Sequence, residues 1–110
     1  MESTAGKNFF SGKAYRLFVE ELATHLTAAA ASFSDDHICS ATELRQLSSR
    51  FHTIKGGAGF FGLTDVQDLA GKLEDTLGVL SPSCLKTKPE LCAIFEALKS
   101  ISARLPTPAQ

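Results

Sequence analysis

The sequence has no tryptophan, no long hydrophobic run and no excess of charge of either sign. No stretch approaches the roughly 18–20 consecutive apolar residues that a membrane-spanning helix requires. The first seven residues, MESTAGK, also lack the apolar segment of a secretory signal. We therefore expect no membrane insertion and a cytoplasmic location.

The charges nearly balance, with eleven Lys and Arg residues against twelve Asp and Glu residues and a formal net charge of −1. Non-specific binding to duplex nucleic acid depends on basic side chains that neutralise phosphates. Because the chain has no such excess of basic residues, we expect no nucleic-acid partner.

Cysteine is scarce and irregularly spaced: Cys39, Cys84 and Cys92 are odd in number and form no C-x-x-C pair. This pattern argues against a disulfide framework and against a zinc knuckle. We expect three reduced thiols, with Cys92 half-buried on a helix.

The histidines are also few, and their spacing relative to nearby aspartates matches no pattern typical of metal ligands. We therefore expect no metal site and no cofactor. The residues concerned are His25, His37 and His52 with Asp35 and Asp36.

The chain does contain enough apolar residues for one core. With 110 residues, of which 44% are hydrophobic, residues 1–110 fit a single domain that folds without a metal or a disulfide. We expect this domain to be a monomer.

Apolar residues recur at steps of three and four along four segments, which is the period of an amphipathic helix. The first segment spans residues 11–33, and the second begins near residue 41 after a capping box at residues 40–43. The third begins with a similar pattern at residues 64–67, and the fourth with a cap signal at residues 87–90 that includes Pro89. Gly62 is placed to end the second helix in the left-handed conformation.

No segment alternates with period two for long enough to form a strand, and each helix has one apolar face. These patterns predict an all-α fold, an antiparallel up-down four-helix bundle with short connections. The predicted core stripes are Ala14, Leu17, Phe18, Leu22, Leu26, Ala29 and Phe33 in the first helix, Leu44, Leu47, Phe51, Ile54, Ala58 and Phe61 in the second, Val66, Leu69, Leu73, Leu77 and Leu80 in the third, and Leu91, Ile94, Leu98, Ile101 and Leu105 in the fourth.

The second helix contains a conflict, because Gly56, Gly57 and Gly59, within residues 52–62 (HTIKGGAGFFG), lie inside a helical period. Each interior glycine costs roughly 0.5–1 kcal/mol relative to alanine. A loop would explain them, since residues 57–62 match the G-x-G-x-x-G pattern of dinucleotide-binding loops. That loop requires a preceding strand and an acidic residue about 20 positions later, and the sequence has a capped helix and Leu80-Ser81-Pro82 instead. We therefore expect a helix.

On a helix, His52, Lys55, Gly56 and Gly59 fall at positions i, i+3, i+4 and i+7 and share one stripe. This stripe is turned away from the buried stripe through Phe51, so the imidazole is predicted to be reachable from outside. The glycines lower the helix surface beside the ring, and the lysine can meet an anion carried on it. These features favour reversible phosphorylation of the histidine. The plainer alternative is a surface histidine beside a solvated lysine.

Residues 52–63 (HTIKGGAGFFGL) resemble the phosphorylation-site helix of histidine-containing phosphotransfer (HPt) domains. They are most similar to the module of chemotaxis-type histidine kinases, whose pattern is H-S/T-I-K-G-G-A-x-x-F-G. Residues 69–75 (LAGKLED) resemble the next helix of that subfamily, L-A-H-x-L-E, with Gly71 where the pattern has a second histidine. Any hydrogen-bond network through that histidine is therefore missing here.

The resemblance implies that His52 carries the phosphoryl group, that Lys55 steadies it, and that Gly56 and Gly59 leave room for a receiver domain. It also implies that Glu74 accepts a hydrogen bond from Nδ1 of His52. Such a bond fixes the tautomer in which Nε2 presents its lone pair. The alternative for Glu74 is a solvated helix charge.

The chain is too short to include an ATP-binding kinase domain and shows no strand pattern of a receiver domain. The resemblance therefore implies a phosphocarrier without kinase activity of its own, whose partners are a histidine kinase and a response-regulator receiver domain. The alternative is a helical interaction module that docks a receiver domain or another signalling regulator without carrying phosphate. Both a free-standing relay protein and one module of a larger kinase fit the sequence.

Four further residues are candidates for partner docking. Arg45, Ser48 and Ser49 precede His52 by about one to two turns, on roughly its side of the helix. Charge at such positions can steer an acidic receiver pocket, and the alternative is a plain surface role. Phe60 is predicted either to be a partly exposed docking anchor or to pack against the first helix.

Overall fold

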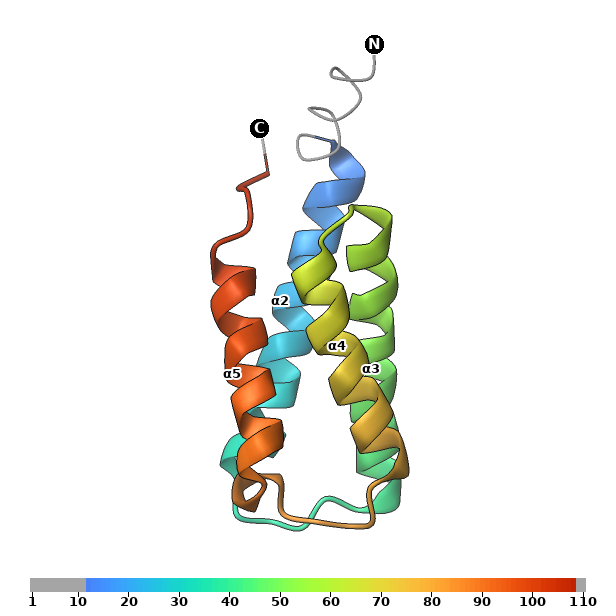
Figure 1. Cartoon of the computed structure of the whole chain (residues 1–110), viewed down its shortest axis with the longest axis vertical. Coiled ribbons are helices and arrows are strands. Elements are labelled where there is room, and N and C mark those ends of the chain that lie inside the picture. Colours follow the sequence, from blue (N-terminus) through green and yellow to red (C-terminus); the bar gives the residue numbers. More distant parts are fainter. Residues whose placement is uncertain (1–11, 109–110) are drawn as a thin grey trace.

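The computed structural model describes residues 12–108 and consists there of four α-helices and one 3₁₀ turn (Figure 1). The helices alternate in direction along the chain, so sequential helices are antiparallel neighbours. This confirms the predicted all-α, up-down four-helix bundle, although the predicted first residue, Ser11, lies outside the described residues. The elements are α2 (Lys13–Ser34), α3 (Ala41–Phe60), α4 (Thr64–Val79), η1 (Leu85–Thr87) and α5 (Pro89–Ala103).

Both predicted ends of α3 are confirmed. At its start, the Glu43 backbone N–H donates to Oγ of Ser40 at 3.1 Å, and the Ser40 N–H donates to Oε1 of Glu43 at 2.9 Å. This is a complete capping box. At its other end, Gly62 adopts a φ of 70°, a conformation that other residues rarely take. Local interactions therefore determine where the helix that carries His52 begins and ends.

The predicted side-chain caps of the next two helices are wrong. After the turn at Gly62, α4 begins at Thr64, so Thr64 lies inside the helix and cannot cap it with its hydroxyl. The N-cap residue is Leu63. Before α5, η1 places Lys88 at the cap position, and the Thr87 hydroxyl donates to the Cys84 carbonyl at 2.7 Å. Pro89 does lie in the first turn of α5, as expected.

The core stripe of α3 is buried at every predicted position, and Cys92 is half-buried as expected. The prediction for α2 is partly wrong, because Ala14 and Leu17 are exposed, Leu17 by 50%, and Tyr15 is buried instead. The Tyr15 hydroxyl donates to the Pro106 carbonyl at 2.7 Å, which satisfies the one polar atom of that buried ring. In α5, Phe95 is buried and stacks on Phe33 with 4.4 Å between ring centroids.

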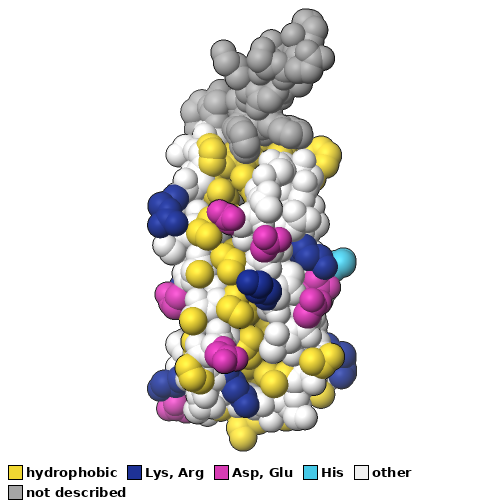
Figure 2. Space-filling view, viewed as in Figure 1, with side chains coloured by type: hydrophobic (Ala, Val, Ile, Leu, Met, Phe, Trp, Pro, Cys, Tyr) yellow, Lys and Arg dark blue, Asp and Glu magenta, His cyan; other side chains and the backbone are white. Residues whose placement is uncertain are grey.

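The helices α3 and α4 form the most closely packed pair of the bundle. Figure 2 shows charged side chains of both signs interspersed on the viewed face, with a band of hydrophobic side chains along the long axis. Within residues 12–108, no helix combines the length and the hydropathy that a membrane span requires.

Two of the α3 glycines differ sharply in their surroundings. A Cβ built on Gly57 would lie 2.6 Å from Cδ1 of Phe18, so this glycine permits the close approach of α2. A Cβ on Gly56 would meet nothing within 4 Å. Packing of α2 thus explains one glycine of the run and leaves Gly56 without a role in the core.

We predict opposite effects on stability for alanine at these two positions. In Gly57→Ala the new Cβ collides with the Phe18 ring, which should destabilise the fold by roughly 1–3 kcal/mol. The higher helix propensity of alanine offsets part of this loss. Gly56→Ala, the matched control, should stabilise it by about 0.5–1 kcal/mol because only the propensity changes. Urea unfolding of both variants measures the difference, and equal effects of the same sign would contradict the packing argument.

Candidate functional site

His52 stands on the exposed side of α3. Its neighbours Phe51 and Ile54 are buried, and one residue corresponds to a rotation of about 100° around a helix, so the imidazole is carried out of the core. The side chain is 67% exposed. Its Nδ1 lies 2.8 Å from Oε2 of Glu74 on the neighbouring helix α4.

Glu74 serves two partners with its two carboxylate oxygens. Oε2 contacts the His52 ring, and Oε1 lies 2.7 Å from Nζ of Lys55. The Glu74 side chain is 20% exposed and that of Lys55 35% exposed. The structure therefore brings together the three side chains that the sequence singled out for phosphate chemistry, and one carboxylate joins them.

Electrostatics fixes the direction of the His52–Glu74 hydrogen bond. The Lys55 ammonium, assisted by the His52 ring, holds the pKa of Glu74 below its ordinary value of 4.5. The same pair raises the pKa of Lys55 above its ordinary value of 10.5. At neutral pH the carboxylate is ionised and can only accept, so Nδ1 donates, and in the neutral form of the ring Nε2 carries the lone pair.

Gly71 provides the space that Lys55 occupies. A Cβ at this position would lie 3.3 Å from Cδ of Lys55, which is tighter than an ordinary van der Waals contact. The missing side chain thus lets the lysine lie against α4 on its way to Glu74. The position where the resemblance expects a second histidine is used here to seat the lysine, and the His52–Glu74 contact is present without that histidine.

The two glycines predicted to clear a docking surface have different surroundings. Gly56 is exposed, with open space where its Cβ would be. A Cβ on Gly59 would come within 2.9 Å of Nε2 of Gln67, so Gly59 lies at the seam between α3 and α4. The bare surface beside Lys55 is therefore provided chiefly by Gly56.

Three of the remaining docking candidates, Arg45, Ser49 and Phe60, are exposed on the surface. Arg45 is exposed, with Nη2 3.4 Å from Oγ1 of Thr42, and Ser49 is exposed. Phe60 is 66% exposed, and its ring meets Phe61 edge-on at a centroid distance of 5.0 Å.

Ser48 faces the neighbouring helix. Its hydroxyl donates to the Glu74 carbonyl at 2.9 Å, and the space for it comes from Gly78, whose Cβ would lie 3.3 Å from Oγ. Sequence reasoning grouped Ser48 with the surface residues, because nothing along α3 shows which side α4 covers. The hydrogen bond holds the backbone of Glu74 against α3, directly beside the carboxylate that meets His52.

The family model of the Hpt domain matches residues 13–105, which is most of the chain. The protein belongs to the Hpt domain family. No curated protein and no solved structure matches the sequence significantly.

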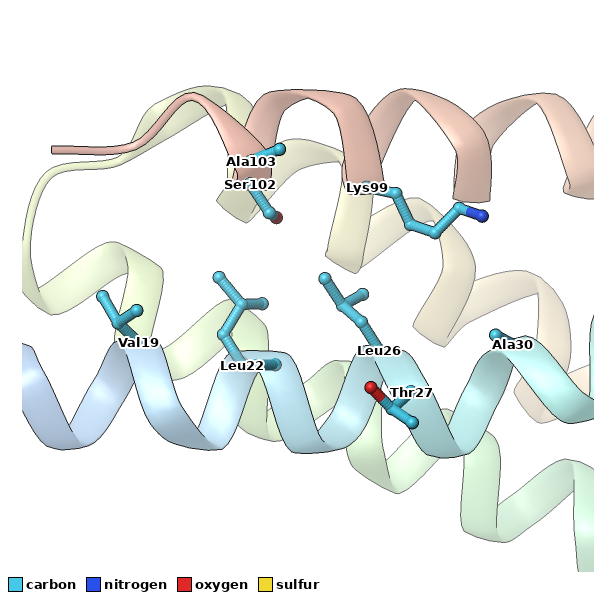
Figure 3. A pocket seen from close by; sticks show the side chains of 9 residues that line it. Val19, Leu22, Leu26, Thr27, Ala30, Lys99, Ser102 and Ala103 are labelled. Carbon is cyan, nitrogen blue, oxygen red and sulfur yellow. The ribbon is translucent and has the colours of Figure 1, made fainter. Parts of the chain in front are cut away.

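A groove of about 430 Å³ lies elsewhere on this Hpt domain, between α2 and α5. Figure 3 shows Val19, Leu22 and Leu26 projecting from α2 toward α5, with Ser102 pointing back from the opposite side. None of His52, Lys55 and Glu74 lines it. The candidate site of the Hpt domain is an open helix surface, with the His52 side chain 67% exposed.

The lowered pKa of Glu74 leads to a pH prediction. A carboxylate whose pKa is depressed in the folded state stabilises that state above its unfolded pKa, and the stabilisation is lost as the pH falls through the folded value. The free energy of unfolding of the Hpt domain should therefore exceed that of Glu74→Gln at neutral pH, and the difference should vanish well below pH 4.5.

Urea unfolding between pH 3 and pH 7 measures this difference, because carboxyl groups titrate within this range. Glu20→Gln, on the exposed face of α2, is the control for a simple change of net charge. A difference that stays constant with pH would show that Glu74 is not ionised against its two partners.

Proposed function

We propose that His52 carries a phosphoryl group on Nε2 and relays it between a histidine kinase, or the phosphoaspartate of a receiver domain, and a response-regulator receiver domain. The observation that carries the proposal is the exposed ring whose Nδ1 is bound to Glu74. This bond leaves the nucleophilic nitrogen free and directed away from the carboxylate. Membership of the Hpt family supports a phosphotransfer module of this kind.

The transfer step needs little from the domain itself. The Nε2 lone pair forms a bond to phosphorus while the bond from phosphorus to the leaving oxygen breaks, and that oxygen keeps the electron pair as a carboxylate or as ADP. The ring becomes positively charged because Nδ1 keeps its proton, and the Glu74 carboxylate stabilises this charge. The receiver aspartate reverses the step. Positioning and any Mg²⁺ come from the partner.

Lys55 is placed to neutralise the phosphoryl group. Its Nζ contacts the same carboxylate that binds the His52 ring, so the ammonium already lies beside the imidazole. Once Nε2 carries a dianionic group, that group competes with Oε1 of Glu74 for the ammonium. Gly56, one residue further along α3, leaves the surface bare where a receiver domain would approach.

Phosphorylation is tested by incubating the chain with phosphorylated receiver domains and with histidine kinases under single-turnover conditions. We expect label that is labile to acid and stable to base, and its complete loss in His52→Gln. His25→Gln and His37→Gln are the matched controls and should keep it. If no donor labels the chain while receiver domains still bind it, the protein is an interaction module that carries no phosphate.

Replacements of Glu74 separate tautomer control from simple charge loss. In Glu74→Gln the amide can donate to Nδ1, which favours the proton on Nε2 and blocks the nucleophile. In Glu74→Ala both tautomers remain accessible. We expect transfer to fall on the order of 10–100-fold in the glutamine variant, and less in the alanine variant, because a wrong histidine tautomer costs up to ~10⁴ in serine proteases.

Rapid-quench transfer rates and ¹⁵N chemical shifts of the ring nitrogens measure the two effects together. Asp75→Asn, at the next position of α4, controls for the loss of one negative charge on that helix. Equal slowing of the alanine and glutamine variants would indicate that Glu74 acts through its charge, which both variants lose, and not through the tautomer.

A further inference from the structure

A second cluster of reactive side chains lies at the end of the bundle where the α2–α3 connection passes beside the segment that follows α4 (Figure 1). Nε2 of His37 lies 3.1 Å from Oε2 of Glu43 and 3.8 Å from Sγ of Cys39. All three atoms lie within 4.8 Å of one another. The proposed phosphotransfer chemistry uses none of these residues.

The spacing of the three atoms suits a tetrahedral zinc ion. Zinc binds imidazole nitrogen and carboxylate oxygen at roughly 2.0–2.2 Å and thiolate sulfur at about 2.3 Å, so neighbouring ligands of a tetrahedral site lie about 3.3–3.8 Å apart. The two distances from His37 fall close to that range without rearrangement of the backbone. Imidazole, thiolate and carboxylate are also the side chains that zinc takes most often.

We propose that His37, Cys39 and Glu43 form a Zn²⁺ site whose fourth position is open to water or to a ligand from a partner. A proton can bridge only one pair of these atoms at a time, whereas a cation contacts all three. The spacing of histidines and aspartates in the sequence predicts no metal site. The present ligands follow a different pattern, H-x-C-x₃-E.

Two of the three ligands are held in place by the backbone. The Cys39 N–H donates to the Ser83 carbonyl at 2.8 Å, and the Ser83 N–H donates back to the Cys39 carbonyl at 3.2 Å. Glu43 uses only Oε1 for the capping box with Ser40, which leaves Oε2 available. The thiol residue is buried while His37 is exposed, so a metal ion has a path of entry from the imidazole side.

The carboxylate of Asp35 lies beside His37. Its Oδ2 is 3.8 Å from Nδ1 of His37, the ring nitrogen that would not bind the metal; this is longer than a hydrogen bond, and a small movement of the exposed Asp35 side chain would form one. Histidines that bind metals usually donate this second N–H to a carboxylate, a carbonyl or water, and loss of that partner costs about 10–100-fold in affinity. The neighbouring Asp36 pairs with Lys86 at 3.0 Å and so provides a matched control.

Titration of the chelator-treated, untagged chain with Zn²⁺ and with Co²⁺ tests the site. We expect one equivalent to bind, a thiolate-to-Co²⁺ charge-transfer band, and a melting temperature that rises with metal concentration. Cys39→Ser should abolish the band, whereas Cys84→Ser and Cys92→Ser should keep it. Circular dichroism of each variant shows whether the bundle is still folded.

Two milder variants make the test independent of the buried thiol. Glu43→Gln preserves the capping box but removes the anionic ligand, and should weaken Zn²⁺ binding strongly. Asp35→Asn should weaken it about 10–100-fold and Asp36→Asn should not. Absence of one-to-one binding, or binding unchanged in Cys39→Ser and Glu43→Gln, would overturn the site. His52 is untouched by these variants, so this result is independent of phosphotransfer.

Discussion

The candidate phosphotransfer site depends on one carboxylate that is shared between two helices. Glu74 leaves α4 and contacts both His52 and Lys55 on α3, at 2.8 and 2.7 Å. An ionised carboxylate can only accept a hydrogen bond, so the contact with Glu74 favours the tautomer of the neutral ring in which Nδ1 carries the proton. The proposed role of Nε2 as the nucleophile therefore depends on the position of α4 relative to α3.

That position in turn depends on small residues at the seam between the two helices. Gly71 makes room for the Lys55 stem, Gly78 for the Ser48 hydroxyl, and Gly59 for the Gln67 side chain. Each of these glycines weakens its own helix by roughly 0.5–1 kcal/mol relative to alanine. This loss of helix stability accompanies a close approach of α3 and α4. That approach brings Glu74 within hydrogen-bond distance of His52.

The sequence predicted several locally determined parts of the fold, although not the N-caps of α4 and α5. The capping box at Ser40, the left-handed Gly62 and the buried stripe through Phe51 follow from chemistry within a few residues, and all three are confirmed. The stripe of α2 was misplaced at Leu17 because Tyr15 pairs with a carbonyl 91 residues away, and no periodicity within the helix carries that information.

The same limit applies to the site. The pattern along α3 identified His52, Lys55 and Gly56, whose relationship is one of helical spacing. It could not show that Ser48 faces α4, that Gly71 seats Lys55, or that Cys39 and Glu43 lie together with His37. These are contacts between segments or across a loop, and they depend on the relative position of helices that only the folded bundle defines.

An exposed site of this kind favours a carrier over a catalyst. The ring is 67% exposed, and water reaches it as readily as a protein partner does, so the domain alone cannot exclude competing hydrolysis. In the unmodified site the charges of Glu74 and Lys55 cancel. The proposed transfer would add a dianion and a positive ring between them, and these charges would be balanced without being enclosed. The phosphoryl group would then stay available to a partner that approaches over the bare surface at Gly56.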